Sequence, residues 1–322
     1  MSFSDLPKFV VNHLCSFLDM HSYATFSLIN KKYYDNLKHI RDLMRIIKQN
    51  YSNQFEYQNI SKIIEESQND SKNYPLLHFV VINNKVTIEM IKFMIENKSD
   101  LNYQDNFKDN TALHLACESN VPFEMIKCLV ENKSELNLQE KKENFTPLHI
   151  VLKSPNIAIT NIKYLIENKS NVNLGDKSKK SSLHIALKNR NVSIEMIKYL
   201  VENKSDLNLE SFYKEIPLHE ACDNNHISIE IFKYLVEKKS SLNHQNSYND
   251  IPLHLAINRN ISNDKIIFLI ESKSDLNKIN SHENVPLFKL LENYQDDLRI
   301  KEIVQKHKRE NNIQQDNNCF IF

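Results

Sequence analysis

The sequence predicts an all-α solenoid, in which similar helix pairs are stacked along one axis. Two observations carry this prediction. The dipeptide Leu-His recurs with its histidine at positions 78, 114, 149, 184, 219 and 254, at intervals of 36, 35, 35, 35 and 35 residues. A second marker, ENKSDLN and its variants, ends at positions 102, 137, 173, 208, 243 and 277, at intervals of 35, 36, 35, 35 and 34. Because two independent markers keep one period, the chain contains an array of near-identical units.

The composition excludes several classes of protein. The 322 residues include 41 basic and 41 acidic side chains, so no overall field attracts nucleic acid. The single glycine, Gly175, rules out a phosphate loop, a dinucleotide fingerprint and a nucleophile elbow, each of which needs several glycines. We therefore expect no enzyme, no cofactor and no nucleic-acid partner.

Each unit is predicted to be a pair of helices. In TPLHIVLKS (146–154), Thr146 is a good N-cap and Pro147 stands at the first helical position, where its missing N–H is not needed. In the following unit, Ser193 can cap a second helix. Its apolar face consists of Met196, Ile197, Leu200 and Val201. One helix pair cannot bury apolar surface on both of its sides, so the units must stack.

Several of these segments resemble a known repeat. TPLH at 146–149, PLHEA at 217–221 and PLHLA at 252–256 are similar to the T-P-L-H-x-A signature of ankyrin repeats. The ENKSDLN segments resemble the part of that repeat that leads to its β-hairpin finger. The resemblance spans about residues 75–293 and implies an ankyrin-repeat solenoid, whose last unit (285–293) looks like a terminal cap with Phe288 in place of histidine.

The array departs from the ankyrin pattern in two ways. Its period is 35 residues, where about 33 is usual. Lysine also replaces the glycine expected after each second helix, at positions 98, 133, 169, 204, 239 and 273. A left-handed backbone at a residue other than glycine costs about 1 kcal/mol, and asparagine tolerates it better. We therefore expect the turn to shift onto the preceding asparagine, as at Asn97, Asn132, Asn168 and Asn203.

The repeated histidine is expected to be structural. The ankyrin resemblance implies that it forms local hydrogen bonds that order the fingers. A metal site needs ligands that converge on one point, whereas stacked units would space these side chains about 10 Å apart. We expect no metal site.

A different pattern stands at the N-terminus. Residues Leu6 to Leu37 read LPKFVVNHLCSFLDMHSYATFSLINKKYYDNL and resemble an F-box without gaps. This resemblance implies docking to the adaptor subunit of SCF-type cullin–RING ubiquitin ligases. By motif position the adaptor-binding residues are Leu6, Pro7, Val10, Leu14, Leu18, Ile29 and Tyr33. The pattern departs from the family at Phe9, His21 and Tyr33. The alternative is a plain helical cap on the first repeat.

The chain ends in NNCFIF, a C-a-a-X arrangement with Cys319 fourth from the end. A final phenylalanine favours a geranylgeranyl group, although Phe320 is not the aliphatic residue that the motif prefers. The alternative is an unmodified cysteine. The five cysteines are widely spaced and contain no C-x-x-C pair, which indicates free thiols in a reducing compartment. We expect a cytoplasmic protein, with peripheral membrane association if Cys319 is prenylated.

These patterns divide the chain into four parts. An F-box-like domain covers 1–38, and a helical bridge or degenerate capping repeat covers 39–72. The array of six full repeats and a terminal cap covers 73–309. A tail with the C-a-a-X box covers 310–322.

The partner-binding surface is predicted at the finger tips. Residues 139–190 carry ten basic and four acidic side chains, whereas 201–240 carry five and eight. We expect the basic tips to bind an acidic segment and aromatic tips to act as apolar anchors. The predicted partner-binding residues are Phe107, Lys108, Lys141, Lys142, Lys177, Phe212, Tyr213 and Tyr248. The alternative is a solvated lysine-rich surface without a partner.

Two functions follow from these parts. The chain is either a substrate receptor of an SCF-type ligase, whose array binds the target, or a non-catalytic ankyrin scaffold whose N-terminal helices only cap the array. Binding to the ligase adaptor would distinguish the two.

Overall fold

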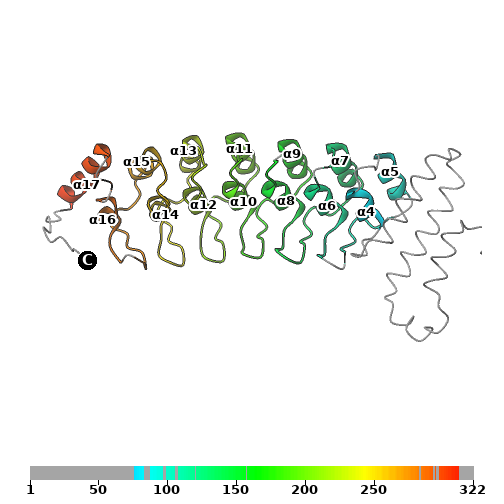
Figure 1. Cartoon of the computed structure of the whole chain (residues 1–322), viewed down its shortest axis with the longest axis horizontal. Coiled ribbons are helices and arrows are strands. Elements are labelled where there is room, and N and C mark those ends of the chain that lie inside the picture. Colours follow the sequence, from blue (N-terminus) through cyan, green and yellow to red (C-terminus); the bar gives the residue numbers. More distant parts are fainter. Residues whose placement is uncertain are drawn as a thin grey trace, which may run out of the picture.

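A computed structural model describes residues 76–82, 88–96, 99–105, 108–119, 121–156, 158–282, 284–292, 294 and 297–311. In these residues the chain forms seven helix pairs in one row (Figure 1). The first helices are α4 (Leu76–Ile82), α6 (Ala112–Glu118), α8 (Pro147–Lys153), α10 (Ser182–Lys188), α12 (Pro217–Asp223), α14 (Pro252–Asn258) and α16 (Leu287–Leu291). The second helices are α5 (Ile88–Glu96), α7 (Phe123–Glu131), α9 (Ile159–Glu167), α11 (Ile194–Glu202), α13 (Ile229–Glu237), α15 (Asn263–Glu271) and α17 (Leu298–Glu310). The prediction of an all-α array of stacked helix pairs is confirmed.

Some predictions fall on other parts of the chain. The F-box-like segment with its seven adaptor-binding residues, the bridge at 39–72, Phe107 and Cys319 all lie outside the described residues.

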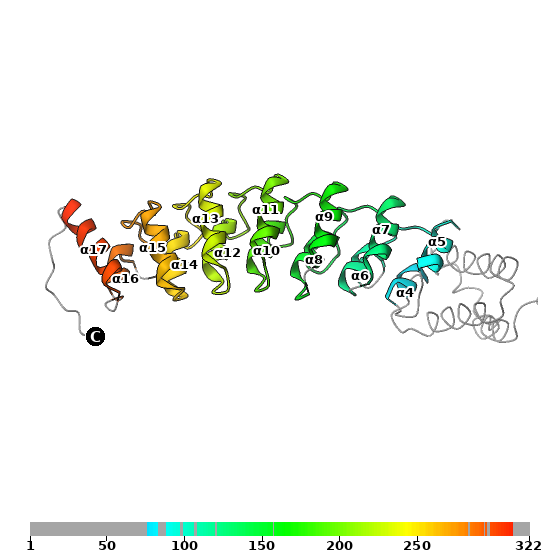
Figure 2. The same cartoon turned by 90° about the horizontal axis from the view of Figure 1, so that it is seen from above.

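The helix pairs stack in two layers. First helices contact first helices of the neighbouring pairs, and second helices contact second helices, as Figure 2 shows from above. The loops that lead from one pair to the next all project to the same side of the row (Figure 1). We call these loops fingers and number their tips in chain order: 105–110, 140–145, 176–180, 211–215, 246–250 and 280–285.

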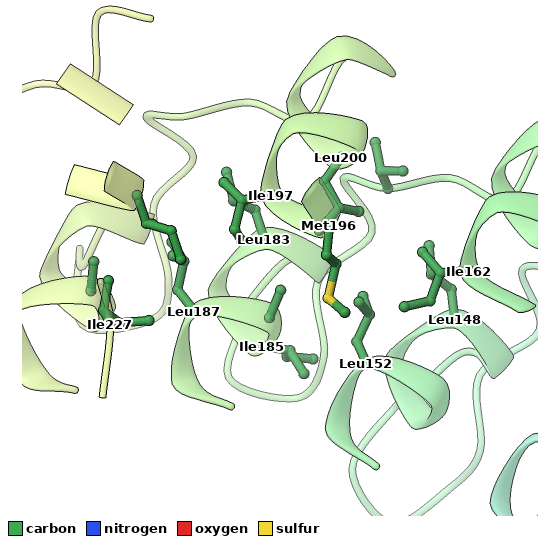
Figure 3. Packing of buried hydrophobic residues seen from close by; sticks show 14 of the residues in the cluster. Leu148, Leu152, Ile162, Leu183, Ile185, Leu187, Met196, Ile197, Leu200 and Ile227 are labelled. Atoms are coloured by element: carbon green, nitrogen blue, oxygen red, sulfur yellow. The ribbon is translucent and has the colours of Figure 1, made fainter. Parts of the chain in front are cut away.

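The core runs without interruption along the stack. Leu148 of α8 and Ile162 of α9 point toward each other within one pair and are fully buried (Figure 3). In the next pair Met196, Ile197 and Leu200 are buried on one face of α11, as the sequence predicts. Because equivalent positions are buried in successive pairs, each helix pair depends on its neighbours for burial.

The repeated histidine is the third residue of the first helices α4, α6, α8, α10, α12 and α14. In α8, Thr146 caps the helix by accepting a hydrogen bond from the His149 backbone N–H at 3.3 Å, and Pro147 is the first helical residue, as predicted. The Thr146 N–H in turn donates to His149 Nδ1 at 3.2 Å. In α12 the N-cap is Ile216, which has no hydroxyl, yet its N–H still donates to the imidazole of His219 at 3.1 Å.

The second imidazole nitrogen reaches the next finger. His78 Nε2 lies 2.8 Å from the carbonyl of Asn110, and His184 Nε2 lies 3.0 Å from that of Glu215. Since Nδ1 of His184 accepts from Ser181 N–H, its proton is on Nε2, which donates to the carbonyl. Burial lowers the pKa of His184 to about 4. The neutral imidazole thus ties the start of one helix to the following finger, which confirms the local role implied by the resemblance.

The turn after the second helices differs from the sequence prediction, which placed the left-handed backbone on asparagine. The lysines have the left-handed backbone, with φ of 71°, 76°, 70°, 71° and 76° at Lys133, Lys169, Lys204, Lys239 and Lys273. The asparagines at 132, 168 and 203 do not, with φ of −93°, −88° and −92°, whereas Asn97 and Lys98 lie outside the described residues. The reason is that Asn203 Nδ2 donates to the Tyr199 carbonyl at 2.8 Å, which caps the helix end from a normal backbone. The next two N–H groups, of Lys204 and Ser205, close the helix by bonding the Val201 and Leu200 carbonyls.

The two turn residues should respond oppositely to glycine. Lys204→Gly removes a side chain from a backbone with φ of 70°, so we expect the free energy of unfolding to rise by up to about 1 kcal/mol. Asn203→Gly relieves no such strain and loses the side-chain bond to Tyr199, so we expect a fall of about 1 kcal/mol. Urea unfolding of both variants measures the difference, and changes of the same sign would contradict this assignment of the turn.

Acid should destabilise the array through its histidines. The unfolded chain binds a proton at His184 near pH 6.5, whereas the folded chain binds it only near pH 4. Between these values the unfolded state holds more protons than the folded state. The free energy of unfolding therefore falls as the pH drops from 6.5 toward 4, by up to about 1.4 kcal/mol for each pH unit. Urea unfolding between about pH 7 and pH 4.5 should show a shallower pH dependence for His184→Gln than for the wild type. Equal slopes would show that His184 does not contribute.

Candidate functional site

The fingers are tight turns, which corrects the expected β-hairpins. In the third finger two backbone bonds close the tip, from Asp176 N–H to the Lys180 carbonyl at 3.0 Å and from Lys179 N–H to the Asp176 carbonyl at 2.8 Å. The fourth finger has the same two bonds, at 2.8 and 2.9 Å. Within the described residues the one bridge of β type joins Ile279 and Pro286.

Backbone bonds also join each finger to the next. The N–H of Lys141 donates to the Lys108 carbonyl at 2.8 Å, and that of Phe212 donates to the Ser178 carbonyl at 2.7 Å. The remaining links of this kind are Lys177 to Glu143, Ser247 to Tyr213 and Ser281 to Tyr248, at 2.8 to 2.9 Å. The finger tips therefore form a continuous row along one side of the stack (Figure 1).

The acidic side chains of the basic fingers turn inward. Asp176 Oδ1 accepts hydrogen bonds from the backbone N–H groups of Ser178 and Lys180 at 2.7 and 2.9 Å. Glu140 is buried, and its carboxylate accepts from Lys142 and Glu143 N–H at 2.7 Å each. These two carboxylates therefore hold the turns, with Glu140 buried and Asp176 half-buried, while the neighbouring lysines of the second and third fingers are exposed.

The predicted basic residues lie together on the first three fingers. Lys141, Lys142 and Lys177 are exposed, and Lys108 on the first finger is half-buried. Lys179 is exposed beside Lys177. The backbone links between these fingers bring the lysines into one surface, which we call the basic tips.

Aromatic side chains continue the row on the next fingers. Phe212, Tyr213 and Tyr248 are 65%, 47% and 44% exposed. The rings of Tyr213 and Tyr248 are stacked with centroids 6.2 Å apart, and Tyr248 stacks in turn on His282 of the sixth finger at 5.6 Å. The three predicted aromatic residues therefore lie in one cluster, which His282 extends. We call these four side chains the aromatic tips.

A pocket of about 340 Å³ lies beside the aromatic tips. It is formed by Tyr248 and His282 on the finger side and by residues of α10, α12 and α14, including the half-buried Leu255. Its charged lining residues are Lys180, Lys188, Glu215, Glu220, Asp223, Asp250 and Arg259. The sequence analysis missed this pocket, because its residues come from three repeats and no local motif connects them.

A charge cluster lines the pocket, in which Glu220 is buried and Lys180 and Glu215 are half-buried. Lys180 pairs with Glu220 and lies 3.4 Å from Glu215. Burial alone would lower the pKa of Lys180, but the two carboxylates outweigh it and raise the pKa above its usual range. At the pocket rim, Arg259 pairs with Asp223.

The described residues offer little for covalent or metal chemistry. The thiols of Cys117, Cys128 and Cys222 are free and buried, and burial raises their pKa, which makes them poor nucleophiles. Nowhere in the described ranges do three His, Cys, Asp or Glu side chains converge to hold a metal ion. None of the described helices has the length and apolar character that a membrane span requires.

Comparison with known proteins agrees with this geometry. A family model described as ankyrin repeats (3 copies) matches residues 43–140, 120–211 and 193–280. The match does not extend to residues 1–42. No curated protein matches the chain. With the family model covering most of its length, and with stacked helix pairs, histidine-tethered fingers and a period of 35 residues, the chain belongs to the ankyrin-repeat proteins.

Proposed function

We propose that this chain is a protein-binding module whose finger row binds a polypeptide partner. Ankyrin repeats suggest protein–protein interaction as the general function. The observation that carries the specific proposal is the arrangement of the row. Its basic tips present lysines while their carboxylates are turned inward, and exposed aromatic tips follow directly. An acidic segment would lie on the former and apolar side chains of the partner on the latter.

Physical chemistry gives the two surfaces different roles. Exposed charges of one sign mainly raise the rate of association with partners of the opposite charge. They lower the rate for partners of the same charge. Large aromatic side chains supply most of the affinity when a partner covers them. Phe212 is 65% exposed, so it has much apolar surface to bury on binding. A surface of solvated lysines alone would not account for the adjacent aromatic tips.

Charge reversal at the basic tips should slow the association. We expect Lys141, Lys142, Lys177 and Lys179, all changed to Glu, to reduce the association rate with the natural partner by about tenfold or more at low salt and to weaken its salt dependence. Stopped-flow or surface-plasmon measurements with the partner purified from the native cell provide the rates.

The matched control carries the same number of reversals on the second helices. Lys92, Lys127, Lys198 and Lys233 are exposed there, away from the fingers. Their change to Glu should leave the rate within about twofold, because long-range charge effects are screened over about 10 Å at ordinary salt. Equal effects of the two sets of variants would overturn the proposed role of the basic tips.

We also propose a more specific assembly, in which residues 1–38 dock to an SCF-type ligase adaptor and the array at 73–309 holds the target. The gap-free resemblance of residues 6–37 to an F-box supports this proposal. The division of the chain into these parts, with a bridge at 39–72 and a tail at 310–322, belongs to the same proposal. So does prenylation of Cys319, which would bring the ligase to membrane-bound targets.

Adaptor binding should depend on the Leu-Pro pair. We expect Leu6→Ala with Pro7→Ala to abolish co-purification of the ligase adaptor from the native cell, because both residues occupy docking positions of the motif. The repeats should remain folded, since they are stabilised mainly by their own interfaces. Lys8→Ala is the control, because this position is not among the docking residues. Failure of the wild-type chain to retain an adaptor would instead favour the scaffold, whose N-terminal helices only cap the array.

A further inference from the structure

The lining of the pocket beside the aromatic tips includes two stacked aromatic rings. The rings of Tyr248 and His282 are inclined by only 30°, with centroids 5.6 Å apart, and both line the pocket. Leu255 of α14 adds aliphatic surface. The volume of about 340 Å³ lies at the lower end of the range for ligand pockets, so it suits one long side chain rather than a folded segment.

The less exposed part of the pocket lining carries an excess of negative charge. Lys180 pairs with Glu215 and Glu220, and Asp250 adds a third carboxylate to the same lining. Asp250 is buried, and its side chain accepts a hydrogen bond from the neutral amide of Asn280 at 2.8 Å, which supplies no compensating charge. Uncompensated charge of one sign in a partly buried site is unfavourable, and a bound cation would relieve it.

The rim of the pocket does not cancel this excess. Arg259 is occupied by Asp223, and Lys188 is exposed at the end of α10. Taken over the whole lining, four carboxylates face three basic groups. The charge of the lining therefore favours a cationic occupant.

We propose that this pocket binds an arginine side chain of the partner polypeptide. The proposal rests on the function proposed above and names a second, chemically opposite contact of the same partner. A guanidinium group is planar, so it can bond two carboxylates at its edge while its face lies on an aromatic ring. Lysine offers a compact ammonium without this flat face, and an aliphatic residue would leave the carboxylates unpaired.

This assignment also sets the order of charges along the partner. The basic tips are on fingers one to three, whereas the pocket is lined by side chains of fingers three to six. A partner that follows the row would carry an acidic stretch over the former and an arginine over the latter. A uniformly acidic segment would be complementary to the basic tips but not to the pocket.

The test uses a ligand too small to reach the basic tips. Nα-acetyl-arginine methylamide is titrated into the isotopically labelled full chain and followed by NMR, with the citrulline analogue as an uncharged compound of the same shape. We expect the arginine compound to shift the backbone resonances of Tyr248, Asp250 and Asn280, with a Kd of about 1 mM. The citrulline compound should bind about tenfold more weakly, because it lacks the charge.

Three variants locate the contact. Glu215→Gln should weaken arginine binding by about tenfold, since it removes a charge-assisted hydrogen bond. Tyr248→Ala should weaken it by about threefold, and its exposed position makes it a second variant that keeps the fold. Lys188→Gln is the matched control at the same pocket and should not weaken binding. Resonances of α6 and α8 report that the fold is unchanged.

The outcomes separate the two proposals. Absence of shifts at the pocket, equal binding of the arginine and citrulline compounds, or unchanged binding by Glu215→Gln would overturn the arginine site. None of these results depends on the basic tips. Conversely, if charge reversal at the basic tips leaves partner association unchanged, the acidic-segment proposal fails while a positive arginine titration still stands.

Discussion

Every repeated helix in this protein is too short to be stable alone, and the rest of the structure depends on that constraint. The complete first helices span seven residues and the second helices of the six full units span nine, as in α8 and α9. Isolated helices of fewer than about 12 residues are marginal in water even with favourable sequences. Stability therefore comes from contact between units, through buried residues such as Leu148 and through imidazoles such as that of His184, which links its first helix to the next finger.

The same dependence explains how a chain of zero net charge presents a basic surface. The carboxylates of Asp176 and Glu140 are needed to hold the backbone of their fingers, so they are withdrawn from solvent. Lysines have no such task, because an ammonium group cannot accept a hydrogen bond from an N–H group. The carboxylates are thus held in the turns while the lysines face solvent. The finger tips are therefore locally basic, although the net charge of the chain is zero.

The sequence predicted the features that recur in phase and missed those that do not. Thr146, Pro147 and the buried face of α11 follow from local rules of helix formation, and the structure agrees with them. The turn was predicted wrongly because intrinsic preference favoured asparagine, whereas a side-chain bond from Asn203 to Tyr199 decides the backbone. The pocket was missed because Lys180 and Glu220 meet only when two repeats stack, and their separation in sequence follows no motif. Phe212, Tyr213 and Tyr248 lie together in the structure, and His282, which the sequence analysis did not include, extends their cluster. Their role in partner binding stays a prediction.

The backbone links between fingers have a consequence for how such a surface changes over evolution. Each step along the row is fixed by a main-chain hydrogen bond of 2.7 to 2.9 Å, to which no tip side chain contributes an atom. Substitution of a residue such as Phe212 or Lys141 therefore alters what a contact point recognises without altering where it stands. Mutations at such exposed positions can replace one preferred partner by another at nearly constant stability, because main-chain bonds and a few other side chains, such as Asn280, set the distance between successive recognition points.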